Sequence, residues 1–298
     1  MPVIDCLHLY PIKSCAGISL SSATLGHAGL EHRGVGDREW MLVDADSGQF
    51  LTQRQAPRMA LIQPSLEGDT APGAEAPGMD SMPPDSMAVN APGQATLRIA
   101  IAGAAARTAS RPVKLWNHAC LAIDEGDEAA AWFSAFLGRA LRLVRFDPAH
   151  QRASNREWTG EIEALNRFSD GYPILLISRA SLADLNDRLA QAGREALPMN
   201  RFRPNVVLDG VGPYEEDYLL SLAGAGVELR PVKPCPRCPI PSVEQSTGIV
   251  GPDPLDILAQ YRNDERTGGV IFGQNIVAVQ GRGAALRVGQ ALTPEWNF

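Results

Sequence analysis

The part of the sequence with the most evident chemistry is a short proline-rich segment that carries two cysteines. Cys235 and Cys238 lie three positions apart, with Arg237 between them and prolines on either side. Each proline fixes its own φ angle and biases the preceding residue toward an extended conformation, so we expect both cysteines on a stiff loop. A nearby guanidinium favours the thiolate form of a cysteine. The segment therefore predicts a sulfur that binds a metal, exchanges a disulfide or attacks an electrophile.

The local sequence leaves several interpretations of this cysteine pair open. A structural zinc site needs about four ligands, but the chain has no second Cys-x-x-Cys pair and its five histidines are scattered. A thioredoxin-type pair normally lies between a strand and a helix start, whereas prolines and β-type residues follow Cys238. The other interpretations are two buried structural cysteines, or one thiolate on a soft or cofactor-bound transition metal, because soft sulfur ligands select such metals.

Basic side chains in turns form a second candidate group. Lys13 and Ser14 follow the first predicted strand and can bind a phosphate, the lysine as a point charge and the serine as a hydrogen-bond donor. Arg38 and Arg203 each precede a strand-like run. Taken singly, such residues are typical of solvated loops and surface salt bridges. If they converge, they form a pocket that holds an anion through bidentate guanidinium contacts.

The elements that must position these residues are mostly short strands. Three helical patterns are present, at 126–137, at 181–191 with Ser181 as the expected N-cap, and at 253–262. The regular βαβ alternation of a doubly wound sheet is absent, so we predict a β-rich α+β fold that is barrel-like in its second half. Strand-like runs bounded by turn residues lie at 3–9, 40–43, 50–52, 95–101, 113–116, 141–146, 174–178, 206–208, 227–232, 270–272, 276–279 and 286–288.

The length of 298 residues predicts about two domains. We place them at 1–146 and 147–298, with the boundary in the polar run 147–152. The segment 67–94 is rich in Gly, Pro, Ala, Asp and Ser and contains no aromatic residue. Such a composition buries too little apolar surface to offset chain entropy, so we predict a flexible insertion between two strands.

Composition and charge exclude several classes of protein. The chain is 45% hydrophobic and 20% charged, as in an ordinary globular protein. Its net charge of −7 argues against a nucleic-acid partner, because such binding neutralises phosphates with lysine and arginine. No secretory signal and no bilayer-spanning apolar run is visible, so we expect no membrane partner and a cytoplasmic location. Cys6, Cys15 and Cys120 are then expected to be free thiols.

Read in order, these motifs resemble the MOSC-domain proteins that carry an N-terminal β-barrel domain, a family that includes the mitochondrial amidoxime-reducing component and its bacterial relatives. The similarity covers nearly the whole chain except 67–94. It rests on Tyr10-Pro11-Ile12-Lys13-Ser14-Cys15-x-Gly17, Gly36-Asp37-Arg38, Phe168-Ser169-Asp170, Ala180-Ser181-Leu182-x-Asp184-Leu185-Asn186, Arg201-Phe202-Arg203-Pro204-Asn205, Pro234-Cys235-Pro236-Arg237-Cys238 and Phe272-Gly273-Gln274-Asn275.

The resemblance implies a molybdenum–molybdopterin cofactor. Cys238 would be the thiolate ligand of the metal, and Cys235 would support the loop without binding metal. The pterin and its phosphate would be held by Lys13, Ser14, Arg38, Arg203 and Arg237, with Asn205, Asn275 and the backbone of Pro236 completing the site. The resemblance also suggests binding of a molybdenum ion and of pyridoxal phosphate.

The implied activity is the reduction of N-hydroxylated substrates, such as amidoximes or hydroxylamino-purines, by oxygen-atom abstraction. Bacterial relatives often carry a C-terminal ferredoxin domain that is not seen here, so we expect electrons from a separate donor protein. Gly171-Tyr172 replaces two small hydroxyl residues of close relatives, and Asn275 replaces an aromatic residue of some. The alternatives are a carrier of molybdenum cofactor or sulfane sulfur on Cys238, and a degenerate fold that binds no cofactor.

Overall fold

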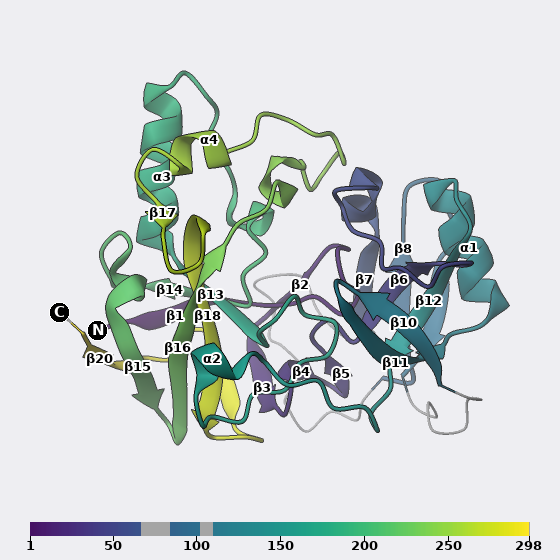
Figure 1. Ribbon diagram of the computed structural model, residues 1–298, viewed down its shortest axis with the longest axis horizontal. Helices are drawn as coiled ribbons and strands as arrows, with labels where there is room; N and C mark the ends of the chain where they lie inside the picture. The colour runs from purple at the N-terminus through teal and green to yellow at the C-terminus, as the bar shows by residue number, and fades with distance from the viewer. Residues whose placement is uncertain (67–83, 102–109, 298) are drawn as a thin grey trace.

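The structure of the protein is a computed structural model that describes residues 1–66, 84–101 and 110–297 (Figure 1). Its largest sheet has nine strands in the order β2-β1-β14-β13-β18-β16-β15-β20, with β17 paired to β18. The β13–β14 pair is parallel and the other pairs are antiparallel. The strands are β1 Val3–Leu9, β2 Ile18–Leu20, β13 Ile174–Ser178, β14 Val206–Asp209, β15 Leu219–Gly224, β16 Val227–Pro236, β17 Asn263–Asp264, β18 Gly269–Gln280 and β20 Thr293–Trp296.

Three smaller sheets complete the β structure. They have the orders β10-β11-β12-β6, β19-β3-β4-β5 and β7-β8-β9. Strands β6 to β8 and β10 to β12 gather with helix α1 on the right of Figure 1, away from the largest sheet. The strands are β3 Ser22–Gly26, β4 Gly29–His32, β5 Val35–Gly36, β6 Trp40–Asp44, β7 Gln63–Leu66, β8 Ser86–Asn90, β9 Leu97–Ala100, β10 Arg111–Leu115, β11 His118–Asp124, β12 Leu141–Phe146 and β19 Ala285–Arg287.

Two helices of more than one or two turns cover the sheets in the described residues. Helix α1 (Asp127–Leu137) has two carboxylates in its first turn, which suit the positive end of the helix dipole, and ends at Gly138 in the left-handed conformation. Helix α3 (Arg179–Gln191) stands above the large sheet in Figure 1. The short helical segments are α2 Arg156–Thr159, α4 Leu255–Leu258, η1 Pro57–Leu61, η3 Met199–Arg201, η4 Glu215–Tyr218 and η5 Ile240–Ser242.

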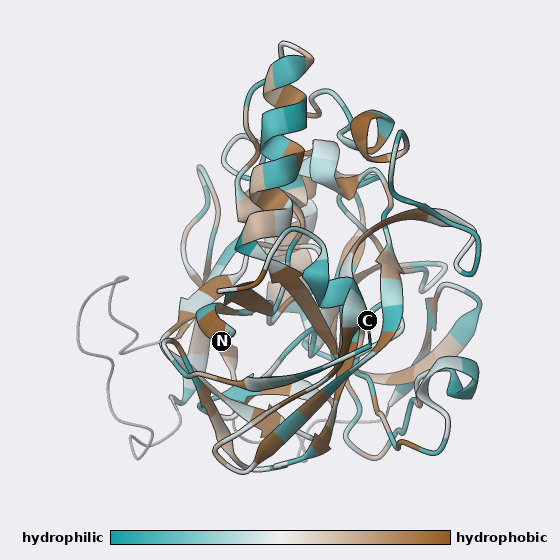
Figure 2. Cartoon of the chain, turned by 90° about the vertical axis from the view of Figure 1, so that its left-hand side faces the viewer, coloured by the Kyte–Doolittle hydropathy of each residue, from teal (hydrophilic) through white to brown (hydrophobic). Residues whose placement is uncertain are grey.

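One hydrophobic cluster extends through both groups of strands. Trp40 and Phe133 from the first half pack in the same cluster as Ile174 and Ile276 from the second, and all four side chains are fully buried or nearly so. Figure 2 shows hydrophobic residues concentrated on the strands, while the exposed helix at the top, α3, carries many hydrophilic ones. Burial of this continuous core ties the two groups of strands together.

The prediction of a β-rich α+β fold with two parts is confirmed. The domain limits 1–146 and 147–298 stay a prediction. Sheet pairing crosses residue 146, because β1 pairs with β14 and β3 pairs with β19. No helix within the described residues is long and apolar enough to span a bilayer.

Only part of the predicted insertion at 67–94 lies within the described residues. Residues 67–83 lie outside the described residues, but the prediction was wrong for Ser86–Asn90, which forms β8 between β7 and β9. The physical reason is the alternation of Met87 and Val89, which point inward and are fully buried.

Three other predicted elements have different limits. The run 50–52 forms only an isolated bridge, Phe50 with Val43, because the chain turns directly after Thr52, whose carbonyl accepts from Gln55 and Ala56. The predicted helix 253–262 is only α4, since the chain then leaves to pair as β17 with β18. The N-cap of α3 is Ser178 and not Ser181, because the Ser178 hydroxyl accepts the Ser181 N–H.

Candidate functional site

A cavity of about 130 Å³ lies where segments from both halves of the chain meet. It is lined by side chains from the loop after β1, the turn before β6, the segments before β13 and β14, the end of β16 and the middle of β18. The nine residues predicted for a cofactor site all line it: Lys13, Ser14, Arg38, Arg203, Asn205, Pro236, Arg237, Cys238 and Asn275.

Strained backbone brings the basic residues into the cavity. Ser14, Arg38 and Arg203 adopt positive φ angles of 65°, 48° and 58°. This left-handed region is costly for residues with a Cβ atom and persists only where the surrounding structure enforces it. The Arg38 amide donates to the Tyr10 carbonyl, and the Ser14 carbonyl accepts from the buried Gln53 side chain. Such strain is concentrated at functional sites in proteins.

A buried carboxylate organises the floor of the cavity. Asp37 is fully buried and accepts hydrogen bonds from the Tyr10 amide at 2.9 Å, from Asn205 Nδ2 at 2.9 Å and from the Arg38 guanidinium. Arg38 also donates to Asn205 Oδ1 at 3.0 Å. Asn205 completes its bonding by accepting the Leu175 amide and donating to the His8 carbonyl. These groups fix the Arg38 guanidinium before any ligand arrives.

Tyr10 supports two of the arginines through its ring. The guanidinium carbons of Arg38 and Arg203 lie 4.5 and 4.3 Å from the ring centroid, within the range of cation–π attraction. Gly17 leaves room for this ring, because a Cβ atom there would lie 2.5 Å from Tyr10 Cε1. The sequence motif that joins Tyr10 to Gly17 therefore has a packing function as well as supplying Lys13.

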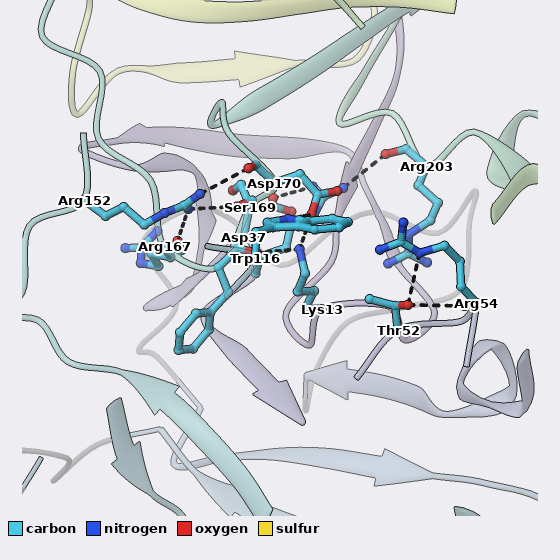
Figure 3. A network of polar contacts seen from close by, with 12 residues as sticks. Lys13, Asp37, Thr52, Arg54, Trp116, Arg152, Arg167, Ser169, Asp170 and Arg203 are labelled. Atoms are coloured by element: carbon cyan, nitrogen blue, oxygen red, sulfur yellow. Dashed lines mark hydrogen bonds and ion pairs between the residues drawn. The ribbon is translucent and has the colours of Figure 1, made fainter. Parts of the chain in front are cut away.

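Lys13 is buried and pairs with a carboxylate at the cavity edge (Figure 3). Its Nζ donates to Asp170 Oδ1 at 2.6 Å and to the Phe168 carbonyl at 2.8 Å, and Trp116 Nε1 also donates to Asp170 at 3.0 Å. Burial lowers the pKa of Lys13. The Asp170 side chain is mostly exposed, and the partial loss of water around it opposes its ionisation, but the Lys13 ammonium and the two hydrogen bonds outweigh this effect and hold the pKa of Asp170 below its usual range.

Arg152 holds the segment that carries Asp170, a role that the sequence did not indicate. Its guanidinium donates to the carbonyls of Arg167, Ser169 and Asp170 at 2.7 to 3.1 Å (Figure 3). An arginine in a polar run of the chain gives no sign of such contacts. Only the fold places it behind this turn.

The two cysteines of the Cys-x-Arg-Cys segment have different surroundings. Arg237 Nη1 donates to Cys235 Sγ at 3.3 Å and its Nη2 donates to the Phe202 carbonyl at 2.7 Å. Cys238 is half-buried, and within the described residues its sulfur has no hydrogen-bond partner. Cys238 is therefore the thiol that the cavity leaves available.

The expectation that both cysteines lie on a loop was wrong for Cys235. Strand β16 continues to Pro236, so Cys235 belongs to the strand and Cys238 to the loop that follows. Register shifts at Pro231 to Pro236 accommodate prolines that cannot donate to the ladder. The Arg237 amide donates to the Val270 carbonyl, which anchors the start of the loop.

Asn275 reaches the cavity because the predicted strand runs 270–272 and 276–279 are parts of one strand, β18. Gly273 adopts a φ of 81°, and a Cβ atom there would lie 2.7 Å from the Leu176 carbonyl oxygen. This close approach of β13 requires glycine and keeps Asn275 opposite Leu175. Asn275 Nδ2 donates to the Lys233 carbonyl at 3.3 Å, next to the cysteine segment.

The polar groups of the site fall into two sets. We call Lys13, Asp37, Arg38, Asn205 and Asp170 the braced cluster, because their side chains bond to one another or to the backbone. We call Ser169, Tyr172, Arg203 and Arg237 the open cluster. Each of these four has a buried polar atom without a hydrogen-bond partner in the described part of the chain: Ser169 Oγ, Tyr172 OH, Arg203 Nη2 and Arg237 Nε.

Unpartnered buried polar atoms are rare in folded proteins and require an explanation. Arginine nitrogens only donate, and a ligand that satisfies two of them accepts hydrogen bonds and carries negative charge. Burial lowers the pKa of Arg203 to about 10, with the nearby Arg38 charge acting in the same direction. An anion beside Arg203 would reverse this effect. Arg203 and Arg237 of the open cluster therefore suit an anionic group.

A second cavity, of about 410 Å³, contains none of the nine predicted residues. Arg145 and Arg167 contribute to its lining, but each forms an ion pair, with Glu39 and Glu31 respectively. Within residues 1–66, 84–101 and 110–297, no group of three or more His, Cys, Asp or Glu side chains is arranged to hold a metal ion. Side chains of these four types would therefore not by themselves complete the coordination of a metal at the first cavity, and a bound cofactor would have to supply further ligands.

Comparison with known proteins agrees with the residue pattern. The model of the MOSC N-terminal beta barrel domain matches residues 1–140, and the model of the MOSC domain matches residues 164–293. Mitochondrial amidoxime reducing component 2 of Rattus norvegicus is 35% identical over 85% of this chain and 70% of its own length. Mitochondrial amidoxime-reducing component 1 of Mus musculus is 32% identical over 90% of this chain and 74% of its own.

A third relative is the molybdenum cofactor sulfurase of Drosophila mojavensis, which is 30% identical over 90% of this chain but only 31% of its own length. The two matched family models together cover every segment that lines the cavity. This chain is a member of the MOSC-domain family, with an N-terminal MOSC β-barrel domain followed by a MOSC domain.

Proposed function

We propose that the protein is a molybdenum-cofactor oxidoreductase that reduces N-hydroxylated substrates such as amidoximes or hydroxylamino-purines. The observation that carries the proposal is the free thiol of Cys238 in the same cavity as two arginines with unpartnered nitrogens. Relatives named as amidoxime-reducing components supply the substrate class. The reaction consumes two protons and two electrons, and it yields an amine or amidine and water.

The residues present fit a molybdopterin bound through its anionic parts. A cavity volume of about 130 Å³ leaves room for a charged head group. The remainder of a larger organic ligand would extend beyond the cavity. Arg203 and Arg237 would hold the phosphate, with Lys13, Ser14 and Arg38 beside them. Cys238 would supply the protein thiolate, since soft sulfur ligands suit such a metal.

When bound, the cofactor supplies an acceptor for the substrate oxygen and cycles by two electrons. The chain itself orients this group and sets the local charge. The braced cluster keeps Arg38 in place without help from a ligand. Arg237 engages Cys235 and leaves Cys238 unengaged, so the two thiols have separate roles in the proposal. Asn205 and Asn275 line the site, and Pro236 contributes backbone there.

Electrons would come from a separate donor protein. The cytoplasmic location, the absence of membrane and nucleic-acid partners, and pyridoxal phosphate binding stay predictions from the sequence and the resemblance. None of them affects the experiment that follows.

The test compares Cys238→Ala with Cys235→Ala as its matched control. The full chain is produced with molybdenum cofactor, and reduction of benzamidoxime by a chemical reductant is measured together with molybdenum per protein. We expect Cys238→Ala to lose its molybdenum and at least 100-fold of its activity, because the metal loses its protein ligand. Cys235→Ala should keep most of its molybdenum and most of its activity. Full activity in Cys238→Ala refutes the assigned ligand.

A second candidate function is a carrier of the cofactor or of a sulfane sulfur on Cys238. The similarity to molybdenum cofactor sulfurases favours it. Intact mass of freshly isolated protein distinguishes the two functions. A gain of one sulfur atom that disappears in Cys238→Ala, with no molybdenum present, supports the carrier. Molybdenum and pterin in equal amounts together with reduction of benzamidoxime support the reductase, whereas the same cofactor content without turnover supports a cofactor carrier.

A further inference from the structure

Tyr172 has a hydroxyl group that the cavity leaves without a partner. The residue lines the cavity together with Cys238, and its hydroxyl oxygen is buried with no hydrogen bond within the described residues. Leaving a buried hydroxyl unpaired costs about 1–3 kcal/mol. This cost is removed if a ligand in the cavity supplies the missing hydrogen-bond partner. This inference rests on the proposed function and concerns the substrate of the same site.

The backbone holds Tyr172 firmly from both sides. Arg152 donates to the Asp170 carbonyl at 3.1 Å, and Asn166 Nδ2 donates to the Gly171 carbonyl at 3.0 Å. Pro173 follows directly and fixes its own φ angle. The main chain on both sides of Tyr172 is therefore held in place. A side chain that projects from such a fixed main chain orients a ligand at reduced entropic cost.

Tyr172 lies beside a different part of the site from the Arg38 and Arg203 pair. Lys233 Nζ lies 5.9 Å from the Tyr172 ring centroid, and the Lys233 carbonyl accepts from Asn275. The guanidinium groups of Arg38 and Arg203 lie instead over the ring of Tyr10. The Tyr172 ring thus lies near Lys233, in the strand that leads to the cysteine segment, whereas the guanidinium of Arg203 lies over the Tyr10 ring.

The phenol suits a neutral ligand group better than an anion. Burial, and next the Glu157 carboxylate, raise the pKa of Tyr172 to about 12, so the side chain keeps its proton at neutral pH. A phenol both donates and accepts one hydrogen bond. An N-hydroxy group offers the matching pair, an oxygen that accepts and an O–H that donates. An amidine nitrogen at the same place would lack that oxygen.

We propose that the Tyr172 hydroxyl binds the N-hydroxy oxygen of the substrate and distinguishes the N-hydroxylated substrate from its reduced product. A site that hydrogen-bonds a substrate hydroxyl disfavours the analogue that lacks it, because its own polar group is then left unpaired. Tyr172 thereby favours both capture of the substrate and release of the product. It acts as a specificity-determining residue, and the oxygen transfer itself does not depend on its proton.

The test uses cofactor-loaded full chain without reductant, so that nothing turns over. Binding of benzamidoxime and of benzamidine is measured by calorimetry in the wild-type protein and in Tyr172→Phe, which removes the hydroxyl and keeps the ring. Tyr218→Phe, at a tyrosine that is 51% exposed, is the matched control. We expect Tyr172→Phe to bind benzamidoxime about 10-fold more weakly, and to bind benzamidine and retain molybdenum as the wild type does.

Equal loss for both ligands, or no loss for either, overturns the inference, as does a wild-type protein that does not bind benzamidoxime. Turnover with a chemical reductant separates the two proposals. If the wild type reduces benzamidoxime and Tyr172→Phe has the same KM, the proposed function stands and the role of Tyr172 falls. If the loaded wild type binds benzamidoxime through Tyr172 but does not reduce it, the proposed function falls alone.

Discussion

The braced and open clusters share one cavity but differ in how their polar groups are satisfied. In the braced cluster, Asp37 alone accepts from three donors, and Lys13 has both a carboxylate and a carbonyl partner. In the open cluster, Arg203 and Tyr172 each keep a buried polar atom without a partner in the described residues. Both sets come from the same few segments, so position in the chain does not explain the difference.

We propose that the contrast separates groups that hold the fold from groups that bind a ligand. Removing one member of a satisfied buried network leaves its partners unpaired, and the cost appears in the free energy of unfolding. Removing a group that has no partner leaves nothing unpaired, so the cost appears only when the ligand binds. Stability and ligand retention should therefore respond oppositely to substitutions in the two clusters, and four changes test this.

The largest effect is expected for Asp37→Ala in the braced cluster. The change leaves Arg38, Asn205 and the Tyr10 amide without their common acceptor, and Arg38 becomes a buried cation without a carboxylate. We expect a loss of about 3–5 kcal/mol in the free energy of unfolding, measured by urea denaturation. Exposed Asp46→Ala is the control and should change it by less than about 0.5 kcal/mol. A loss below about 1 kcal/mol for Asp37→Ala would contradict the bracing role.

Arg203→Ala tests the open cluster. Its guanidinium has an unpartnered nitrogen and a pKa lowered by burial, so its removal should change the stability of cofactor-free protein by less than about 1 kcal/mol. A charge-assisted hydrogen bond to an anion is worth about 1.5–3 kcal/mol, which corresponds to about 10- to 100-fold in affinity. Pterin and molybdenum retained after dialysis should fall accordingly. Arg188→Ala on the surface of α3 is the matched control, and equal retention in both variants would remove Arg203 from the proposed site.

Asp170→Asn tests the edge of the braced cluster. The Asp170 side chain is 66% exposed, and solvent screens its pair with Lys13, so we expect a loss of only about 1 kcal/mol at pH 7. The folded pKa of Asp170 is lowered, so the stabilisation is present above the unfolded value of about 3.9 and disappears as the pH falls through the folded value. Urea denaturation of both proteins at pH 7 and below pH 4 measures this. A difference in the free energy of unfolding between wild type and Asp170→Asn that is larger below pH 4 than at pH 7 would refute the ion-pair explanation.

The smallest effect is expected for Trp116→Phe. The indole N–H donates to Asp170, and it is one of the contributions that lower the pKa of that carboxyl. Trp116 is 41% exposed, so the change in stability should be a few tenths of a kcal/mol. NMR titration of the Asp170 carboxyl should show a higher pKa in the variant. An unchanged pKa would mean that the indole N–H makes no contribution to the pKa of Asp170.

Much of the architecture could be predicted from the sequence because the relevant signals are local. The strands at 3–9, 141–146 and 174–178 have the predicted limits, since short apolar or alternating runs ended by turn residues mark them directly. Strand β8 was hidden by its Pro- and Gly-rich surroundings, and β18 was split at Gly273. In both places composition indicated a turn, while burial and close approach of a neighbouring strand produced a strand.

The site was predictable in its residue types and not in its arrangement. Local motifs named Lys13, Arg38, Arg203 and Cys238, but they gave no role to Tyr10, Asp37 or Arg152. Those roles depend on contacts between segments that are far apart in the chain, as when Asp37 meets Asn205 and Arg152 meets Asp170. No local periodicity encodes such contacts.

The sequence by itself determined the strand-rich composition of the fold, the family, and the set of thiol and basic groups at hand. The tertiary structure alone decided which of those groups are satisfied within the protein and which are left open. That decision is made by burial, because a polar atom is unpaired only when the fold removes water from it and supplies no other partner.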